Sequence, residues 1–310
     1  TIAVSLIGYA EVRRTVTVTA GAPLELVVDL PEGAGQYEEL VTVTGSLRRE
    51  SDAAPAGAML HGRDLQALRG VMLDDPLRAL QSLPSTTSTD DFYTEFAVRG
   101  SSFRHLGLTL DGVPSPYLIH AIHGVADGGS IALINSETLG AAALLPASYP
   151  QRTGRGHGAQ IEMTTPHGTG DGVHGRASLS GTSANIVVEG PLAGDQGSWL
   201  VSARRSYLGY LLARIDPEGS FGFGFSDALA KVTVDLNPRH QIQLLNVFGR
   251  SVFDEEPEEL GINDEASAAS QAWLSAATWR FAPSAQFSIA NRVYGTGMDF
   301  RNLNPSGALL

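Results

Sequence analysis

The chain contains no cysteine, and its basic residues are outnumbered. Its 310 residues carry 21 Lys and Arg against 33 Asp and Glu, a formal net charge of −12. The absence of cysteine excludes disulfide scaffolds, thiolate metal sites and cysteine nucleophiles. The acidic balance argues against nucleic acid or an anionic lipid surface as the main partner.

Long hydrophobic runs are also missing. The longest nearly apolar stretch, residues 139–147, contains Pro146 and is far shorter than the ~18 residues that a membrane helix needs. A chain of this kind that spans a membrane does so with strands. We also expect a fragment or a processed product, because the chain begins with Thr1 inside an alternating apolar run.

The first half of the chain changes character twice. Residues 1–30 alternate between apolar and polar residues in short stretches, which predicts strands separated by turns. Asp75, followed by Pro76 at the first helical position, predicts a helix that Pro84 ends, within a mainly helical stretch over residues 60–83. Short strands with long loops follow. We place these strands at residues 95–98, 106–110, 141–145 and 159–164.

From Gly172 onward, segments of roughly ten residues alternate in polarity and are joined by turn residues. In residues 231–236, for example, Val232 and Val234 fall on one face and Lys231 and Thr233 on the other. Short connections alternate with long ones, which is typical of an outer-membrane barrel. The short connections are residues 191–197, 237–239 and 282–285, and the long ones are residues 207–225 and 251–269.

Several motifs resemble those of the TonB-dependent receptors of the Gram-negative outer membrane, and their order and spacing carry the resemblance. The most specific are Val98-Arg99-Gly100 and Leu110-Asp111-Gly112-Val113-Pro114, which resemble the signature of the family's plug domain. Residues 75–84 resemble the plug helix, residues 149–165 the closing motif of the plug with Thr153 in place of the usual aromatic, and residues 199–207 the third barrel strand. The plug signature residues are Arg99, Gly100, Asp111, Gly112 and Pro114.

The resemblance implies a mainly β chain with three parts: the end of a β-sandwich, a mixed α/β plug domain, and the first strands of an antiparallel transmembrane β-barrel. Barrels of the family resemble 22-stranded barrels with a plugged lumen. The residues after Thr165 suffice for about six to eight strands of ~10 residues each. We expect a carboxypeptidase-regulatory-like sandwich end over residues 1–31, a linker over residues 32–57, the plug over residues 58–166 and barrel strands over residues 172–310.

A short β-branched segment in the expected linker resembles the family's coupling box. Such a segment adds as a strand to the sheet edge of a partner, where backbone hydrogen bonds supply most of the grip. The partner that the resemblance implies is TonB, acting with the ExbB/ExbD complex of the inner membrane. The segment consists of Glu39, Leu40, Val41, Thr42, Val43 and Thr44.

The function that the resemblance implies is energy-coupled uptake across the outer membrane of a substrate too large for porins, with the plug gating the barrel lumen. The substrate class stays open between a siderophore, cobalamin, an oligosaccharide and a peptide, and a surface lipoprotein is an additional candidate partner. Outer-membrane lipid is implied as the surroundings, and no cofactor, metal or nucleic acid is. We expect substrate contacts from a plug loop facing the extracellular vestibule. The candidates are Phe92, Tyr93, Arg104, His105, Tyr117, His120 and His123.

Two other classes of function stay open at this point. A non-transporting β-rich surface adhesin would use the same strands without a plug that gates a pore. A metal-dependent hydrolase would use His105, Asp111, His120 and His123, but neither an HExxH motif nor a cysteine accompanies them. We interpret Asp111-Gly112 as a hairpin turn and expect Arg99 to pair with a plug or barrel carboxylate.

Overall fold

The computed structural model describes most of the chain after residue 56 and two short strands before it. The described residues are 2–4, 12–14, 57–68, 74–88, 94–121, 129–146, 158–193, 196–215, 221–255, 260–261, 266–284 and 287–309. The segment expected as the coupling box, residues 39–44, lies outside them, as do Phe92, Tyr93 and His123. The chain divides into two compact units at Arg48/Arg49, inside the segment expected as a linker.

In the first unit, the described strands β1 (Ile2–Val4) and β2 (Val12–Arg14) pair antiparallel. The second unit holds a mixed α/β part and a large sheet. We call the mixed part, residues 57–166, the plug-like domain, and the large sheet the wall. None of the helices in the described part of the chain is both long and apolar enough to cross a membrane.

The plug-like domain is built on a five-stranded sheet with the order β3-β10-β11-β6-β7, in which only β11 and β6 pair in parallel. Two two-stranded sheets, β4 with β5 and β8 with β9, accompany it. The elements are β3 (Ala58–His61), α1 (Gly62–Leu68), α2 (Pro76–Leu80), β4 (Thr86–Thr87), β5 (Ala97–Val98), the 3-10 helix η2 (Phe103–His105), β6 (Gly107–Leu110), β7 (Val113–Pro114), β8 (Ile119–Ala121), β9 (Gly129–Ala132), the 3-10 helix η3 (Ser136–Thr138), β10 (Ala141–Leu145) and β11 (Gln160–Thr164).

Helix α2 begins where the sequence predicts. Asp75 has an extended backbone and its Oδ1 accepts a hydrogen bond of 2.8 Å from the backbone N–H of Leu77, as an N-cap residue does. The other carboxylate oxygen accepts from the Thr94 hydroxyl and from the backbone N–H of Ala132, so one buried side chain joins the helix to the segment before β5 and to strand β9. The prediction is wrong at Leu60, which lies in β3 rather than in a helix.

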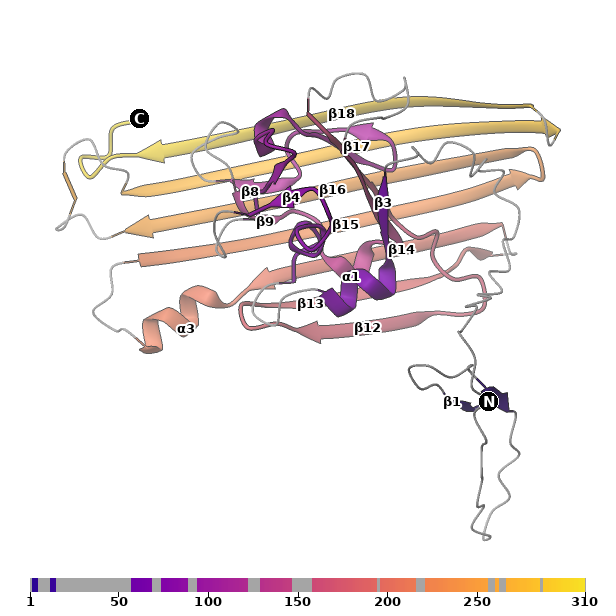
Figure 1. The fold of residues 1–310 in the computed structure, drawn as a ribbon, viewed down its shortest axis with the longest axis horizontal. Coiled ribbons are helices and arrows are strands. Elements are labelled where there is room, and N and C mark those ends of the chain that lie inside the picture. Colours follow the sequence, from indigo (N-terminus) through magenta and orange to yellow (C-terminus); the bar gives the residue numbers. More distant parts are fainter. Residues whose placement is uncertain are drawn as a thin grey trace, which may run out of the picture. The chain divides into compact units, whose positions relative to one another are not determined.

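The wall is an antiparallel sheet of seven strands in sequence order. They are β12 (His174–Leu179), β13 (Ser183–Pro191), β14 (Gly197–Ser206), β15 (Phe221–Asn237), β16 (His240–Glu255), β17 (Ser267–Ser284) and β18 (Phe287–Leu303). Figure 1 shows them side by side, with the plug-like domain against one face. Two of the short connections, between β13 and β14 and between β15 and β16, fall where predicted, whereas residues 282–284, expected in the third, belong to β17. The long connection after β14, expected to be a loop, contains a helix, α3 (Leu208–Ile215).

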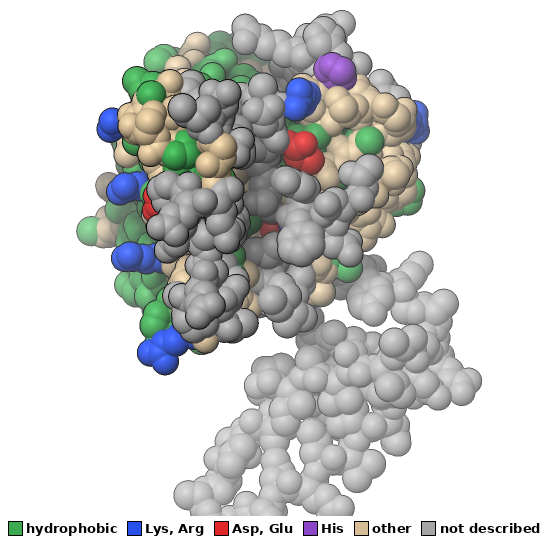
Figure 2. Space-filling view, turned by 90° about the vertical axis from the view of Figure 1, so that its left-hand side faces the viewer, with side chains coloured by type: hydrophobic (Ala, Val, Ile, Leu, Met, Phe, Trp, Pro, Cys, Tyr) green, Lys and Arg blue, Asp and Glu red, His purple; other side chains and the backbone are tan. Residues whose placement is uncertain are grey.

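Alternation along the wall strands separates two faces. On β15, Lys231 and Thr233 are buried against the plug-like domain, while Val232 and Val234 point to the opposite side, as predicted. We call the side that carries the plug-like domain the inner face and the other the outer face. Figure 2 shows a side of the molecule on which hydrophobic side chains gather, with separate Lys and Arg side chains among them.

One hydrophobic core runs through the plug-like domain and onto the inner face of the wall. In the plug-like domain, α2 and the central strands contribute side chains with no exposed surface, such as Leu77, Leu110 and Ile161. The wall adds Leu200 and Leu245 to the same cluster. Because burial of apolar surface contributes roughly 25 cal/mol per Å², this shared core is a large part of what holds the two together.

Candidate functional site: the contacts between the plug-like domain and the wall

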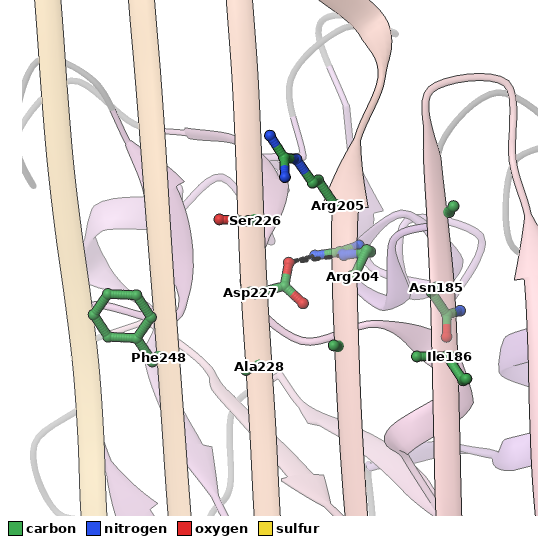
Figure 3. Close-up of a pocket in the computed structure, with 10 residues that line it drawn as sticks. Asn185, Ile186, Arg204, Arg205, Ser226, Asp227, Ala228 and Phe248 are labelled. Atoms are coloured by element: carbon green, nitrogen blue, oxygen red, sulfur yellow. Dashed lines mark hydrogen bonds and ion pairs between the residues drawn. The ribbon is translucent and has the colours of Figure 1, made fainter.

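Two buried charged clusters join the plug-like domain to the inner face of the wall, in addition to a more exposed ion pair of 3.7 Å between Glu137 of η3 and Arg176 of β12. The first is centred on Arg204 of β14, whose side chain is fully buried. Its Nε and Nη2 donate to Asp227 Oδ2 on β15 at 2.8 and 2.7 Å. Nη1 donates to the backbone oxygen of Asp74 at 2.7 Å, and Nη2 also to that of Ala132. Figure 3 shows the Arg204–Asp227 pair crossing between the two strands. Both charges of this cluster therefore belong to the wall, and the plug-like domain supplies carbonyl oxygens.

His120 of β8 extends the first cluster. Its Nε2 lies 3.1 Å from Asp227 Oδ2 and its Nδ1 lies 2.9 Å from Ser251 Oγ on β16. Burial lowers the pKa of His120, although the hydrogen bond to Asp227 acts in the opposite direction. A neutral ring with its proton on Nε2 donates to Asp227 and accepts from the Ser251 hydroxyl, so one tautomer satisfies both contacts.

The wall approaches His120 closely at Gly249. A Cβ added there would lie 1.9 Å from Leu133 Cδ1 and 3.3 Å from His120 Cε1. A larger residue would push the plug-like domain away from β16, so the absence of a side chain sets the distance between the two.

The second charged cluster is centred on Asp111 and Lys231, and here the two charges come from opposite sides of the interface. Lys231 Nζ on β15 donates to Asp111 Oδ2 at 3.1 Å, to Thr165 O at 3.0 Å and to Thr165 Oγ1 at 2.8 Å. Asp111 also accepts from the backbone N–H and hydroxyl of Thr165 and from Gln243 Nε2 of β16. The Lys231 side chain is 3% exposed and that of Asp111 9%. Separation of the plug-like domain from β15 would therefore break a buried ion pair.

The turn that carries Asp111 is built for this contact. Asp111 and Gly112 have φ of +49° and +75° between the paired residues Leu110 and Val113, the pattern of a type I′ hairpin turn, as predicted. The Gly112 carbonyl oxygen accepts a hydrogen bond of 2.7 Å from Arg292 Nη1 of β18. A Cβ on Gly112 would lie 2.7 Å from that same nitrogen. The Asp-Gly turn of the signature thus places the Asp111 carboxylate against β15. It also places the Gly112 backbone, which carries no side chain, against β18.

The other pair of signature residues, Arg99-Gly100, has the same backbone conformation as Asp111-Gly112 but different contacts. Arg99 and Gly100 have φ of +49° and +80°, and Val98 and Ser101 exchange two backbone hydrogen bonds of 2.9 Å across them. We expected Arg99 to pair with a carboxylate, but its side chain is exposed and forms no ion pair with a described residue. The strands predicted at residues 95–98 and 106–110 do not share a sheet, since β5 pairs with β4 and β6 with β11.

The described residues that we expected to contact substrate in an extracellular vestibule differ from one another in burial. His120 is 3% exposed, so the prediction of an exposed loop position is wrong for it. Arg104 and His105 are exposed in η2, and Tyr117 is half-buried and packs against the core. For these three, contact with a substrate stays a prediction.

The residues of the hydrolase alternative have separate partners: Asp111 binds Thr165 and Lys231, whereas His120 binds Asp227 and Ser251. Among the described residues, no group of three or more His, Asp and Glu side chains is arranged as a metal site.

No protein-family model matches the sequence, and no curated protein does. Solved structures of receptors and transporters, however, share the fold. The siderophore receptor PirA from Pseudomonas aeruginosa has a TM-score of 0.53 at 16% identity, over 81% of this chain and 41% of that one. The outer-membrane transporter YddB from Escherichia coli has a TM-score of 0.56 at 11% identity, over 80% and 39%. FpvA from P. aeruginosa, solved with bound pyoverdines, has a TM-score of 0.57 at 14% identity, over 83% and 35%.

The chain therefore has the plug-and-barrel fold of the TonB-dependent outer-membrane receptors, as the motifs predicted. It spans about two fifths of the length of these receptors. The plug-like domain and the wall correspond to a plug and to barrel strands.

Proposed function

We propose that this chain is part of an outer-membrane receptor that imports a substrate too large for porins. The observation that carries the proposal is an α/β domain that is docked by charged and apolar contacts on the inner face of a sheet whose outer face exposes large apolar side chains, such as Ile186, Leu244 and Phe248. A domain in that position closes the lumen of a barrel to which the seven strands belong. A receptor role agrees with the solved structures of the same fold, which are those of receptors and transporters.

The substrate class that we propose is a ferric chelate. Its support is that solved structures of this fold include a siderophore receptor, a ferric enterobactin receptor and a ferric citrate transporter. Arg104, His105 and Tyr117 are the described candidates for contact with it. Direct titration of the full-length protein with ferric siderophores, ferric citrate, cobalamin and oligosaccharides distinguishes these classes, and tight binding of only a non-iron ligand would contradict the assignment.

Energy coupling is proposed to act through residues 39–44, whose β-branched sequence suits strand addition to a partner. Deletion of these six residues from the full-length protein should reduce uptake to background and leave surface binding of substrate unchanged. Deletion of residues 51–56 removes the same length from the expected linker and serves as the control. Uptake that survives the first deletion would contradict coupling at this segment.

Transport requires the plug-like domain to move relative to the wall, and the cysteine-free chain allows a clean test. The hydroxyl oxygens of Ser115 and Thr296 of β18 lie 2.8 Å apart, so cysteines at both positions are placed to form a disulfide across the interface. In S115C/T296C, oxidation should block uptake and a reductant should restore it. A control bridge within the wall is N246C/S275C, at exposed paired positions of β16 and β17 whose side chains lie 2.9 Å apart. Equal uptake by the oxidised and reduced S115C/T296C protein would contradict the required motion.

A further inference from the structure

The outer face of the wall carries a groove of about 510 Å³ on β13 to β16. Its floor is made by Ala203 and Ala228, which are register partners on β14 and β15. Ile186 on β13 and Phe248 on β16 continue the same row on either side, and these two are 51% and 45% exposed. The small residues between two large apolar ones leave an apolar channel along the outer face. Figure 3 shows this row with the plug-like domain behind the strands.

Two arginines lie at one edge of the groove. Arg205 of β14 pairs in register with Ser226 of β15, and Ser226 with Arg250 of β16, so the three form the next row of outer-face residues. Both arginines are exposed, and neither forms an ion pair with a described residue. They are two strands apart, about 10 Å at the backbone. Figure 3 shows the Arg205 side chain extending from β14 toward β15, the strand of Ser226.

An arginine that faces lipid is costly. The penalty is about 2–4 kcal/mol at the bilayer midplane and falls to about 0–1 kcal/mol near the headgroups. Two such residues on one row beside an apolar groove therefore mark the boundary between hydrocarbon and headgroups, with anionic groups as their natural counterions. The net charge of −12 for the whole chain does not oppose this, since the two arginines form a local positive edge.

We infer that this groove is a binding site for an anionic membrane lipid with two phosphate groups, with an acyl chain between Ile186 and Phe248 and the phosphate groups on Arg205 and Arg250. Guanidinium groups bind phosphate oxygens with two parallel hydrogen bonds each, which fixes the headgroup, while the alanine floor accepts the chain. The inference rests on the proposed function, because the outer face meets lipid only if the strands span a membrane.

Lipid binding to the full-length protein tests the site. The delipidated protein in detergent is titrated with lipid A, a diphosphorylated glycolipid, and bound lipid is counted by native mass spectrometry. Each arginine that meets an anionic headgroup should contribute on the order of five-fold in affinity, so R205Q/R250Q should bind lipid A about 20- to 30-fold more weakly than wild type. R239Q/R301Q removes two other exposed arginines and should bind as wild type does.

A second variant tests the groove itself. In A203L/A228L the floor is filled from the outer face, where added side chains meet no part of the plug-like domain, and lipid A binding should also fall. Wild-type affinity in either R205Q/R250Q or A203L/A228L would overturn the inference, as would equal binding of zwitterionic phosphatidylethanolamine. A dimer seated on the groove, seen by light scattering and abolished by A203L/A228L, would also overturn it.

Membrane insertion separates this inference from the function on which it rests. Wild-type protein that inserts into vesicles but binds lipid A no better than R205Q/R250Q would overturn the lipid site alone. Wild-type protein that fails to fractionate with the outer membrane would overturn the proposed function and the lipid site together.

Discussion

The two charged clusters between the plug-like domain and the wall differ in where their charges reside. Arg204 and Asp227 are both on the wall, so their ion pair survives if the plug-like domain leaves, and only hydrogen bonds to carbonyl oxygens and to His120 are lost. Asp111 and Lys231 lie on opposite sides, so the same movement separates the two charges of an ion pair that is buried in the interface. The first cluster forms a prepared surface on the wall, and the second holds the plug-like domain in place.

The largest expected effect comes from breaking the second cluster on one side. Lys231→Met leaves the Asp111 carboxylate without its cation, and removal of one partner of a buried pair costs about 3–5 kcal/mol. This loss of free energy should raise the rate of hydrogen exchange at the backbone amides of the plug-like domain by the factor to which it corresponds. Hydrogen exchange on the full-length protein measures it. The double variant D111N/K231M should recover much of the loss, because neither charge is then left alone. A double variant no better than K231M would contradict the charge argument.

The next effect tests the N-cap of α2. Asp75→Ala removes the hydrogen bonds to Leu77, Thr94 and Ala132, and an N-cap replacement with unpaired buried donors costs about 1–3 kcal/mol. Urea unfolding, monitored by a probe in the plug-like domain, should show this loss of unfolding free energy. Asp64→Ala at the exposed helix α1 is the matched control and should cost less. Equal losses in the two variants would show that the buried contacts of Asp75 add nothing.

The close contact between Gly249 and Leu133 predicts a loss of stability that is similar to or smaller than that of Asp75→Ala. Gly249→Ala places a methyl group against Leu133, and overpacking of this kind costs about 1–3 kcal/mol. Leu133→Ala loses stability by itself through a cavity, but G249A/L133A should be more stable than the sum of the two single changes. A double-mutant cycle of thermal unfolding measures this coupling, and strict additivity would mean that the two positions do not meet.

The smallest expected effect is a pH dependence from His120. Its pKa is lowered in the folded protein, so below the unfolded value of about 6.5 the unfolded chain binds the additional proton and stability falls as pH decreases. A drop from pH 6.5 to 5.5 should cost at most about 1.4 kcal/mol at this site. Unfolding between pH 7.5 and 5.5 measures it, with H120Q as the variant and H240Q, at the first residue of β16, as the control. An identical pH profile for wild type and H120Q would rule out this role.

Local signals make part of the fold predictable. Asp75 and Pro76 predict the start of α2 because the N-cap residue and the first turn of a helix are adjacent in sequence. The alternation in residues 231–236 assigns the two faces of β15 because successive side chains of a strand point to opposite sides. The helix α3 is not predicted although Leu208, Leu211, Leu212 and Ile215 have helical spacing, since the length of the connection favours a loop.

At the site, the contacts between residues far apart in the sequence could not be predicted from the sequence. Nothing near His120 indicates that its ring meets Asp227 and Ser251, which lie 107 and 131 residues away. The Asp-Gly turn is predictable from local conformation, but the contrast between its surroundings and those of the Arg-Gly turn is not. Asp111 meets Lys231 on the wall, whereas Arg99 forms no ion pair with any described carboxylate.

The most direct test of the holding role compares how firmly the plug-like domain is held when each cluster is neutralised. Hydrogen exchange of the β6 and β11 amides is measured in full-length wild type, K231M and the wall-internal double variant R204M/D227N. We predict the fastest plug exchange in K231M and a smaller increase in R204M/D227N, because only the first leaves an unpaired charge in the interface. Faster plug exchange in R204M/D227N than in K231M would contradict the assignment of the holding role to Asp111 and Lys231.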